Sequence, residues 1–513
     1  VGRLFDAETQ LDQSGFVVVQ DSLKQVVWRQ ACLGVYEIFV PSGTWWITAQ
    51  VGPTQIVPPV QEIAVVAGDS VVVDLPIRSW IDLKARGWLA GDVNVKGVSG
   101  EMKRLIAMGD VVRATRAVGL DWAVFTNYLD ATLLPYQVED ELQMHTGFYA
   151  FLGRFFETPL RDVWMMGASS QEAEEVLGAQ ELAHNDRGLV GHTNLFTRKR
   201  HASGVVFDVL SGPTFDCLDV MSEKADDIQA QKMWFDLLNR GYRIAATASS
   251  GAVLDGDNPV LPGTFRTYVR LDGDVTLGRL SQALSQGHSF VSSGPVLLFS
   301  VFAAGPGSDL PVGRKRRATL QAWAGGGDDY LTRIELIRNG EVADTWLLDD
   351  HPRSHKLAVT LQDTVGCWYI AKCYGADETQ VALTNPIYFR APDYQPPEPV
   401  QAVVRGDIQM ADGKPILEAQ VFVKNPLGQV ILQTAARNGQ FRLWVPPTSL
   451  IEVQAKGYDV KRQRIVDNLQ LVGLLDELKQ VASPPDTLVS TTPFERITTS
   501  LKNIEMRFVL NSK

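Results

Sequence analysis

The feature that most constrains the fold is a change of hydrophobic period close to Trp80. Before it, short runs such as residues 15–20 recur between turn residues at roughly eight-to-twelve-residue spacing, which is typical of a small antiparallel β-sandwich. After it, helical patterns such as residues 225–240 alternate with short apolar runs such as residues 205–210, which we interpret as buried strands. This alternation predicts an α/β domain on a parallel sheet, folded as a distorted barrel, as far as residue 295.

Strand patterns return after residue 295, and Asn339-Gly340 is a strong signal for a β-hairpin. The stretch 391–399 is too rich in proline for a helix or a central strand, so we interpret it as a linker. The sequence therefore predicts a multidomain fold, α/β plus all-β, with a distorted (β/α) barrel flanked by one N-terminal and two C-terminal β-sandwiches. The expected units are residues 1–80 (sandwich), 81–295 (barrel), 296–390 (sandwich), 391–399 (linker), 400–465 (sandwich) and 466–513 (extension with a helix at 471–479 and a strand at 504–510).

At 513 residues the chain is too long for one core, and its 45% hydrophobic and 21% charged residues describe a globular protein. The net charge of −11 argues against a nucleic-acid or anionic-membrane surface. No apolar run approaches the ~18–20 residues that span a bilayer, so no transmembrane segment is expected. The cysteines form no C-x-x-C pair, which argues against a zinc or redox site of that kind. The start at Val1 is compatible with a removed signal peptide.

The segment 87–96, Gly-Trp-Leu-Ala-Gly-Asp-Val-Asn-Val-Lys, places Asn94 and Lys96 on one face of a strand, because side chains two residues apart point the same way. It resembles the Gly-Trp-x-x-Gly-Asp-x-His-x-His run that opens the catalytic domain of the CehA/McbA-like (carbaryl-hydrolase-like) branch of the polymerase-and-histidinol-phosphatase (PHP) superfamily. The two histidines of that run bind one metal. A charged lysine has no acceptor, so this strand lacks both expected ligands.

Further stretches carry the same resemblance in order along most of residues 1–390. They are 119–128 (normally ending in Thr-Asp-His), 178–182 (Gly-x-Glu), 188–194 (Gly-His-x-Asn), 247–251 (Gly-Ser-Asp), and 265–269, 287–295, 334–340 and 384–388 (the late signature). The resemblance implies a PHP-type barrel in which histidines and carboxylates bind metal at the C-terminal strand ends and activate water. The implied pocket positions are Asp92, Asn94, Lys96, Asn127, Tyr128, Glu181, His192 and Gly251.

Only Glu181 and His192 remain as weak metal candidates, fewer than the three ligands of a usual catalytic zinc site. Two interpretations of this pair stay open: a remnant of the metal site, or an exposed carboxylate and a core histidine that serve the fold. Asp92 would orient the strand end. We also hypothesise that Lys96 replaces the lost cation and pairs with Glu181, because an unpaired pocket carboxylate is costly.

Residues 403–458 resemble a carboxypeptidase regulatory-like domain, a transthyretin-like sandwich, in the runs 403–409, 412–416, 419–423, 437–443 and 455–458. Such domains are frequent non-catalytic additions to secreted and surface proteins. The resemblance therefore implies a role in stability or interaction rather than chemistry.

The sequence thus predicts a catalytically degenerate, PHP-like pseudoenzyme without catalytic residues or cofactor, which binds a protein partner or joins a larger assembly. It would be secreted, periplasmic or on the cell surface. One alternative is a divergent metal-dependent hydrolase, a phosphoesterase or an amide or ester hydrolase, with a single weakly bound divalent metal. A second alternative is a carbohydrate-binding surface protein, in which Trp45, Trp46 and Tyr369 face a glycan.

Overall fold

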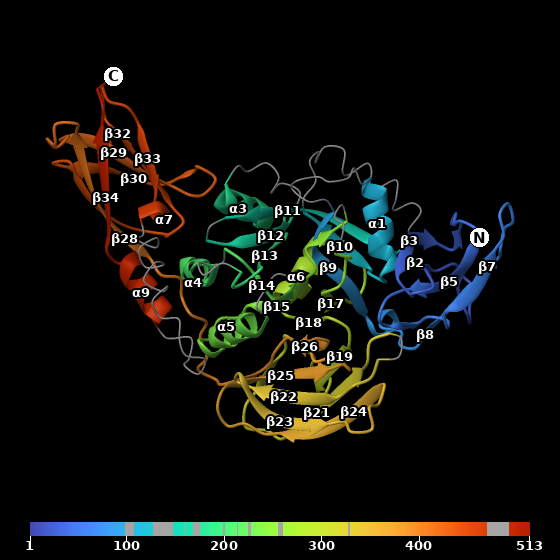
Figure 1. The fold of residues 1–513 in the computed structure, drawn as a ribbon. Coiled ribbons are helices and arrows are strands. Elements are labelled where there is room, and N and C mark those ends of the chain that lie inside the picture. Colours follow the sequence, from blue (N-terminus) through green and yellow to red (C-terminus); the bar gives the residue numbers. More distant parts are fainter. Residues whose placement is uncertain are drawn as a thin grey trace.

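The computed structural model describes residues 1–97, 107–126, 147–158, 160–167, 175–197, 201–212, 214–223, 227–254, 260–326, 329–468 and 492–512. The chain is mostly β-structure (Figure 1). In that view the N-terminal sheet lies to the right of a curled central sheet, a sandwich lies below it, and the C-terminal sheet lies at the upper left. No helix in these ranges is long and apolar enough to span a membrane.

The N-terminal strands form one sheet with the order β6-β8-β1-β4-β3-β2-β5-β7. Their bounds are β1 (Gly2–Asp6), β2 (Ser14–Gln20), β3 (Val26–Leu33), β4 (Val35–Tyr36), β5 (Gly43–Gln50), β6 (Gln55–Ile56), β7 (Gln61–Val65) and β8 (Leu75–Ser79). Val17 and Val19 of β2 enter the core of this sheet, whereas Phe16 and Val18 pack against the central region. The strand predicted at 15–20 is confirmed, and both of its faces are buried.

The central sheet runs in the order β15-β14-β13-β12-β11-β10-β9-β17-β18. Its strands are β9 (Trp88–Gly97), β10 (Trp122–Phe125), β11 (Tyr149–Glu157), β12 (Asp162–Met166), β13 (Leu189–Thr193), β14 (Cys217–Ser222), β15 (Ala245–Ser249), β17 (Arg266–Arg270) and β18 (Ser289–Ser292), and β16 (Ala252–Val253) pairs with β9. The helices of this region are η1 (Lys84–Arg86), α1 (Met108–Ala117), α3 (Val176–Asn185), α4 (His201–Ser211), α5 (Asp227–Asn239) and α6 (Leu277–Ser285). The predicted parallel pairing holds within β9–β11 and within β13–β15. It fails at β12, β17 and β18, which pair antiparallel with their neighbours.

The central sheet curls until β15 packs beside β9, β17 and β18, but no strand ladder closes it within the described ranges. Two side chains bond the edge of β15 instead. The Asn385 amide accepts from Ala246 N (2.7 Å) and donates to Ala246 O (2.9 Å). The Thr267 hydroxyl accepts from Ala248 N (2.9 Å) and donates to Ala248 O (3.0 Å). Because β18 pairs with β26 rather than β15, the structure has a curled half-barrel, and the predicted (β/α) barrel is not closed.

Residues 205–210, interpreted above as a buried strand, lie within α4, so that prediction is wrong. All of their side chains are buried, so no polar side reveals a helical period, and a short apolar run fits either structure. The helix predicted at 225–240 is confirmed as α5, which keeps an exposed polar side.

Residues after 295 form a sandwich of two sheets, one with the order β19-β21-β24 and one that continues the central sheet through β26, β25, β22 and β23. The bounds are β19 (Val296–Val301), β20 (Asp309–Pro311), β21 (Arg316–Trp323), β22 (Arg333–Arg338), β23 (Glu341–Leu347), β24 (Ser354–Leu361), β25 (Cys367–Tyr374), β26 (Val381–Thr384) and β27 (Ile387–Arg390). The predicted hairpin is confirmed, since Asn339 and Gly340 join β22 to β23 with φ values of 51° and 90°. Hydrogen bonding between β18 and β26 crosses residue 295, and the domain limits stay predictions.

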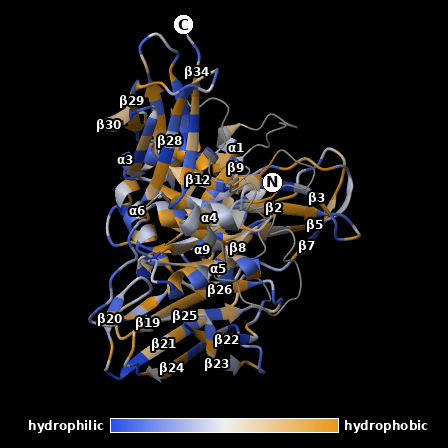
Figure 2. Cartoon of the chain, turned by 90° about the vertical axis from the view of Figure 1, so that its left-hand side faces the viewer, coloured by the Kyte–Doolittle hydropathy of each residue, from blue (hydrophilic) through white to orange (hydrophobic). Residues whose placement is uncertain are grey.

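The C-terminal strands form a sheet with the order β33-β32-β29-β30-β31-β28-β34. The bounds are β28 (Ala402–Met410), β29 (Glu418–Lys424), β30 (Val430–Arg437), β31 (Gln440–Val445), β32 (Leu450–Gln454), β33 (Lys461–Arg464), β34 (Ile504–Leu510), α7 (Ile465–Asn468) and α9 (Thr492–Leu501). Blue and orange bands alternate along β28 and β34 in Figure 2, as expected for strands with one buried face. The strand predicted at 504–510 is confirmed, whereas the helix predicted at 471–479 lies outside the described residues.

The proline-rich segment packs against the central region rather than standing free. The Tyr394 hydroxyl donates to Gly241 O (2.9 Å), and Val400 N donates to Leu210 O (2.7 Å). One hydrophobic cluster also runs from α4 and α5 through α9 into β28 and β34. The C-terminal sheet is therefore joined to the central region by a shared core as well as by the chain.

Candidate functional site

The pocket implied by the sequence begins in the second half of β9, where Asn94 and Lys96 lie. The pairing of β9 with β10 shifts register between Ala123 and Phe125, so β9 bulges there. The Asn94 side-chain oxygen accepts a hydrogen bond from the Thr126 hydroxyl (2.6 Å). The Lys96 ammonium lies 3.6 Å from the centre of the Phe155 ring, a cation–π contact. Thr126 directly follows β10 and Phe155 belongs to β11, so both side chains have partners from the neighbouring part of the sheet.

The interior of the curl beneath these residues is filled by aromatic side chains. Trp122 and Trp164 are fully buried there with residues from strands at both ends of the sheet. The Trp122 ring lies over Gly91 and the Trp164 ring over Gly191, where an added Cβ would come within 2.2 Å of ring carbons. Glycine is thus required at both positions because the rings occupy the space of a side chain.

Asp92 belongs to a different set of contacts from Asn94. Its carboxylate accepts from Gly263 N (2.9 Å), Ser250 N (3.2 Å) and the Ser250 hydroxyl, and also from Asn94 N (3.1 Å). Complete burial raises its pKa, and these hydrogen bonds oppose the rise. Asp92 ties β9 to the segments that follow β15, which fits the expectation that it orients the strand end.

A buried carboxylate that the sequence did not single out lies in the interior. Asp219 of β14 accepts from Thr247 Oγ1 (2.7 Å), Ser249 Oγ (2.6 Å) and Trp164 Nε1 (3.2 Å). Thr193 Oγ1 lies 3.2 Å from the same Ser249 hydroxyl. Burial raises the pKa of Asp219 to about 6, against the opposing effect of these hydrogen bonds. An acidic residue inside the buried run 217–222 was the available sequence signal.

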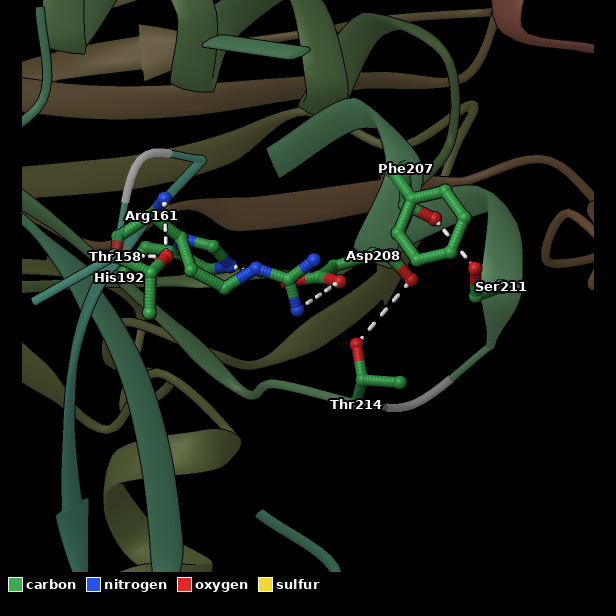
Figure 3. A network of polar contacts seen from close by, with 7 residues as sticks. All are labelled: Thr158, Arg161, His192, Phe207, Asp208, Ser211 and Thr214. Carbon is green, nitrogen blue, oxygen red and sulfur yellow. Dashed lines mark hydrogen bonds and ion pairs between the residues drawn. The ribbon is translucent and has the colours of Figure 1, made fainter. Parts of the chain in front are cut away.

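His192 faces the other side of the sheet, toward α4 (Figure 3). Its Nε2 lies 2.8 Å from Asp208 Oδ2, and Asp208 Oδ1 lies 2.8 Å from Arg161 Nη1. The His192 ring also meets Phe215 edge-on, with centroids 4.6 Å apart. All three charged or titratable side chains are buried, so His192 serves as part of a core network between β13 and α4.

Glu181 lies on α3 and points toward the C-terminal sheet. Its Oε1 accepts from Asn425 Nδ2 (3.1 Å), in the turn between β29 and β30. Partial burial raises its pKa, and nearby His184 lowers it. The hypothesised ion pair with Lys96 is not formed among the described contacts of Glu181, so that hypothesis is wrong.

Of the remaining pocket positions, Gly251 follows β15 with φ of 59°, and the space where its Cβ would be is open. Asn127 and Tyr128 lie outside the described residues. The structure therefore brings Asn94 and Lys96 into one half of the curl with Thr126 and Phe155, and places Glu181 and His192 elsewhere.

The described residues of this arrangement do not fit a catalytic metal. Across the described ranges, no three His, Cys, Asp or Glu side chains form a group that could hold a metal ion. Lys96 adds a positive charge to the face where a metal would sit, and Asp219 is already surrounded by donors. A metal ion bound there would be repelled by the charge of Lys96, and it would have to displace the hydrogen bonds that the Asp219 carboxylate already accepts.

No protein-family model and no curated protein matches the chain. Among solved structures it is similar to a two-domain Bacteroides vulgatus protein described as containing a predicted PHP-like metal-dependent phosphoesterase, with 9% identity, 56% of this chain and 90% of that chain covered, and a TM-score of 0.32. It is also similar to BcpA, the major pilin subunit of Bacillus cereus (10% identity, 44% and 72% covered, TM-score 0.13). A third likeness is to the CARDB domain of a Pyrococcus furiosus protein (15% identity, 19% and 87% covered, TM-score 0.15). TM-scores of this size assign the chain neither a fold family nor a function.

Proposed function

We propose that this chain is a catalytically degenerate relative of the CehA/McbA-like PHP hydrolases that works as a binding or assembly protein, secreted, periplasmic or on the cell surface. The observation that carries the proposal is the separation of the remaining candidate ligands. His192 is engaged with Asp208 on the helix-covered face of the sheet, and Glu181 is engaged with Asn425 of the C-terminal sheet. Among the described residues, the two candidate ligands are therefore held by different parts of the fold and do not converge on one site.

The same geometry argues against the alternative of a divergent hydrolase with one metal at Glu181 and His192, because these side chains point to different neighbours. The carbohydrate-binding alternative needs an exposed aromatic platform. Tyr369 is buried and donates its hydroxyl to Asp363 Oδ2 (2.8 Å), and Trp46 is half-buried beneath the Lys24 ammonium. Of the three aromatic residues named from the sequence, these two therefore offer no open face for a glycan.

A role in assembly is supported by β30, an edge strand with apolar side chains on both faces. β30 pairs with β29 along its length, but its contact with β31 is limited to Arg437 opposite Gln440 in the described sheet. Val430, Ile431 and Leu432 are 52%, 49% and 41% exposed, and the run 430–436 carries no charge. Exposed edges are normally protected by charged residues, and an uncharged one invites a further strand.

Other exposed edge strands of this chain do carry that protection. The charged residues are Glu62 in β7, Glu341 and Asp344 in β23, Lys356 in β24, Lys461, Arg462 and Arg464 in β33, and Glu505 and Arg507 in β34. The contrast within one molecule makes β30 the best-supported assembly edge among the strands that the structure describes.

Metal analysis of the full chain, purified without chelator, tests the loss of catalysis. We expect zinc, manganese and iron well below one equivalent, unchanged in His192→Gln and Asp219→Asn. A variant with both Asn94→His and Lys96→His is the positive comparison, since it restores the two imidazoles that the family places on this strand. Stoichiometric metal in the native chain that disappears in His192→Gln would contradict the proposal.

A further inference from the structure

A polar cavity of about 300 Å³ lies where the N-terminal sheet meets the outer side of β9 and β17. Its wall includes Ser14 at the start of β2, Lys84 of η1, Arg116 near the end of α1, Asp121, and Arg266 and Tyr268 of β17. It adjoins Trp88 and Ala90 in the first half of β9, whereas Asn94 and Lys96 lie in the second half. The volume is at the lower end of the range of small-molecule sites, which favour domain junctions of this kind.

Hydrogen-bond donors line this cavity without partners. The Tyr268 side chain is 1% exposed; the Arg266 guanidinium lies close enough to donate to its oxygen, but its hydroxyl proton has no acceptor within the described part of the chain. The same is true of Ser14 Oγ and Arg116 Nε. Three buried donors without an acceptor in the wall of one cavity are unusual, because buried polar groups are nearly always hydrogen-bonded.

The Tyr268 hydroxyl is held in place and stays protonated. Its ring stacks on Phe290 at a centroid distance of 4.5 Å and an interplanar angle of 9°, which fixes its direction. Burial raises the pKa of the phenol further above its ordinary value, so at neutral pH it is a donor. Arg266, beside it, is anchored by Gly263 O (2.9 Å) and Val118 O (3.2 Å).

The charges of the wall favour an anion, because its three cations, Lys84, Arg116 and Arg266, outnumber its two carboxylates, Asp82 and Asp121. Lys84 is neutralised by Asp121 at 2.6 Å, and Asp121 also accepts from Ala90 N (2.9 Å). Burial lowers the pKa of Arg116, and the attraction of Asp121 only partly opposes this, so the Arg116 cation lacks full compensation. Arg266 adds a second buried cation. A ligand that only accepts hydrogen bonds and carries negative charge would satisfy both the open donors and the excess positive charge.

We propose that this junction cavity binds a small oxyanion, a carboxylate or a phosphoryl group, through donation from Tyr268, Ser14 and Arg116, with Arg266 adding positive charge. The site is separate from the degenerate pocket, so it stands whether or not the chain has lost catalysis. Because its wall comes from both the N-terminal sheet and the central region, a bound anion would also fasten these two parts together.

Titration calorimetry and thermal melting of the full chain with inorganic phosphate, malonate and uncharged glucose test the proposal. We expect phosphate, malonate or both to bind and raise the melting temperature, and glucose to do neither. Phosphate alone would indicate a phosphoryl ligand, and malonate alone a carboxylate. In Tyr268→Phe and Arg116→Gln the binding should weaken roughly tenfold or more, because each removes one hydrogen bond to a charged group.

Tyr369→Phe is the matched control, since Tyr369 is also buried but donates to Asp363. Without added anion, Tyr268→Phe should leave the melting temperature unchanged or raise it, because the hydroxyl proton that it removes has no acceptor in the unliganded chain. Tyr369→Phe should lower the melting temperature and keep the response to anions. The proposal is overturned if no anion binds, if binding survives both cavity substitutions as an adventitious ion only, or if Tyr268→Phe destabilises the unliganded chain as Tyr369→Phe does.

Discussion

Replacing Asp208 by asparagine should destabilise the chain far more than the loss of a surface ion pair of the same length. The Asp208 carboxylate is fully buried and lies 2.8 Å from Arg161 Nη1 and 2.8 Å from His192 Nε2. The Arg161 side chain is only 3% exposed, so the substitution leaves its guanidinium charge in the core without a counterion. Breaking a buried ion pair from one side costs about 3–5 kcal/mol, which is a large part of the stability of an ordinary domain.

The matched control is Asp110→Asn. Arg113 Nη2 lies 2.8 Å from Asp110 Oδ1 as well, but these side chains are 33% and 58% exposed. A pair so exposed contributes only ~0–1 kcal/mol because water and salt screen it. Urea unfolding followed by tryptophan fluorescence should show a large fall of the midpoint for Asp208→Asn and a small one for Asp110→Asn. Equal shifts would refute the argument that burial, rather than distance, decides the contribution of the Asp208 network.

Three further predictions concern Asp219 inside the central sheet, the side-chain hydrogen bonds along the edge of β15, and the edge strand β30. The pKa of Asp219 is raised from 3.8 to about 6, so its neutral form stabilises the fold below pH 4, and that stabilisation is lost as pH rises through 6. The free energy of unfolding of the native chain relative to Asp219→Asn should therefore fall by about 2 kcal/mol between pH 4 and pH 7, and a flat difference would contradict this. Thr267→Val should lower the free energy of unfolding by about 1–3 kcal/mol and speed amide exchange at Ala248, whose N–H donates to the threonine hydroxyl. Unchanged exchange would argue against a role of this side chain in holding the edge of β15. Ile431→Lys should abolish concentration-dependent self-association in sedimentation, whereas Val342→Lys, at an equally exposed position of β23, should not; a chain that is monomeric at every concentration would remove β30 as an assembly edge.

The local hydrophobic pattern was enough to predict elements in which burial follows the period of the strand or turn itself. The strand 504–510 alternates apolar and polar residues and is found as β34 with alternate side chains buried. The Asn339-Gly340 turn needs two residues with positive φ, which is a property of the dipeptide itself. The same approach gave a wrong prediction for residues 205–210. Helix α4 is buried on every side there, and burial on all sides removes the periodic signal.

The sequence by itself determined that this strand carries Asn94 and Lys96, and residue identity alone excludes a charged lysine as a metal ligand. Only the tertiary structure decided where the other candidates point. His192 and Glu181 are close to the expected motifs in sequence, but the alternation of faces along β13 turns His192 to α4, and the packing of the C-terminal sheet draws Glu181 to Asn425. Asp219 and its partners come from different strands, and Asn385 bonds β15 from far along the chain. The donors around Tyr268 likewise come from segments that are distant in sequence. Such contacts depend on how strands are placed beside each other, and no local period in the sequence carries that information.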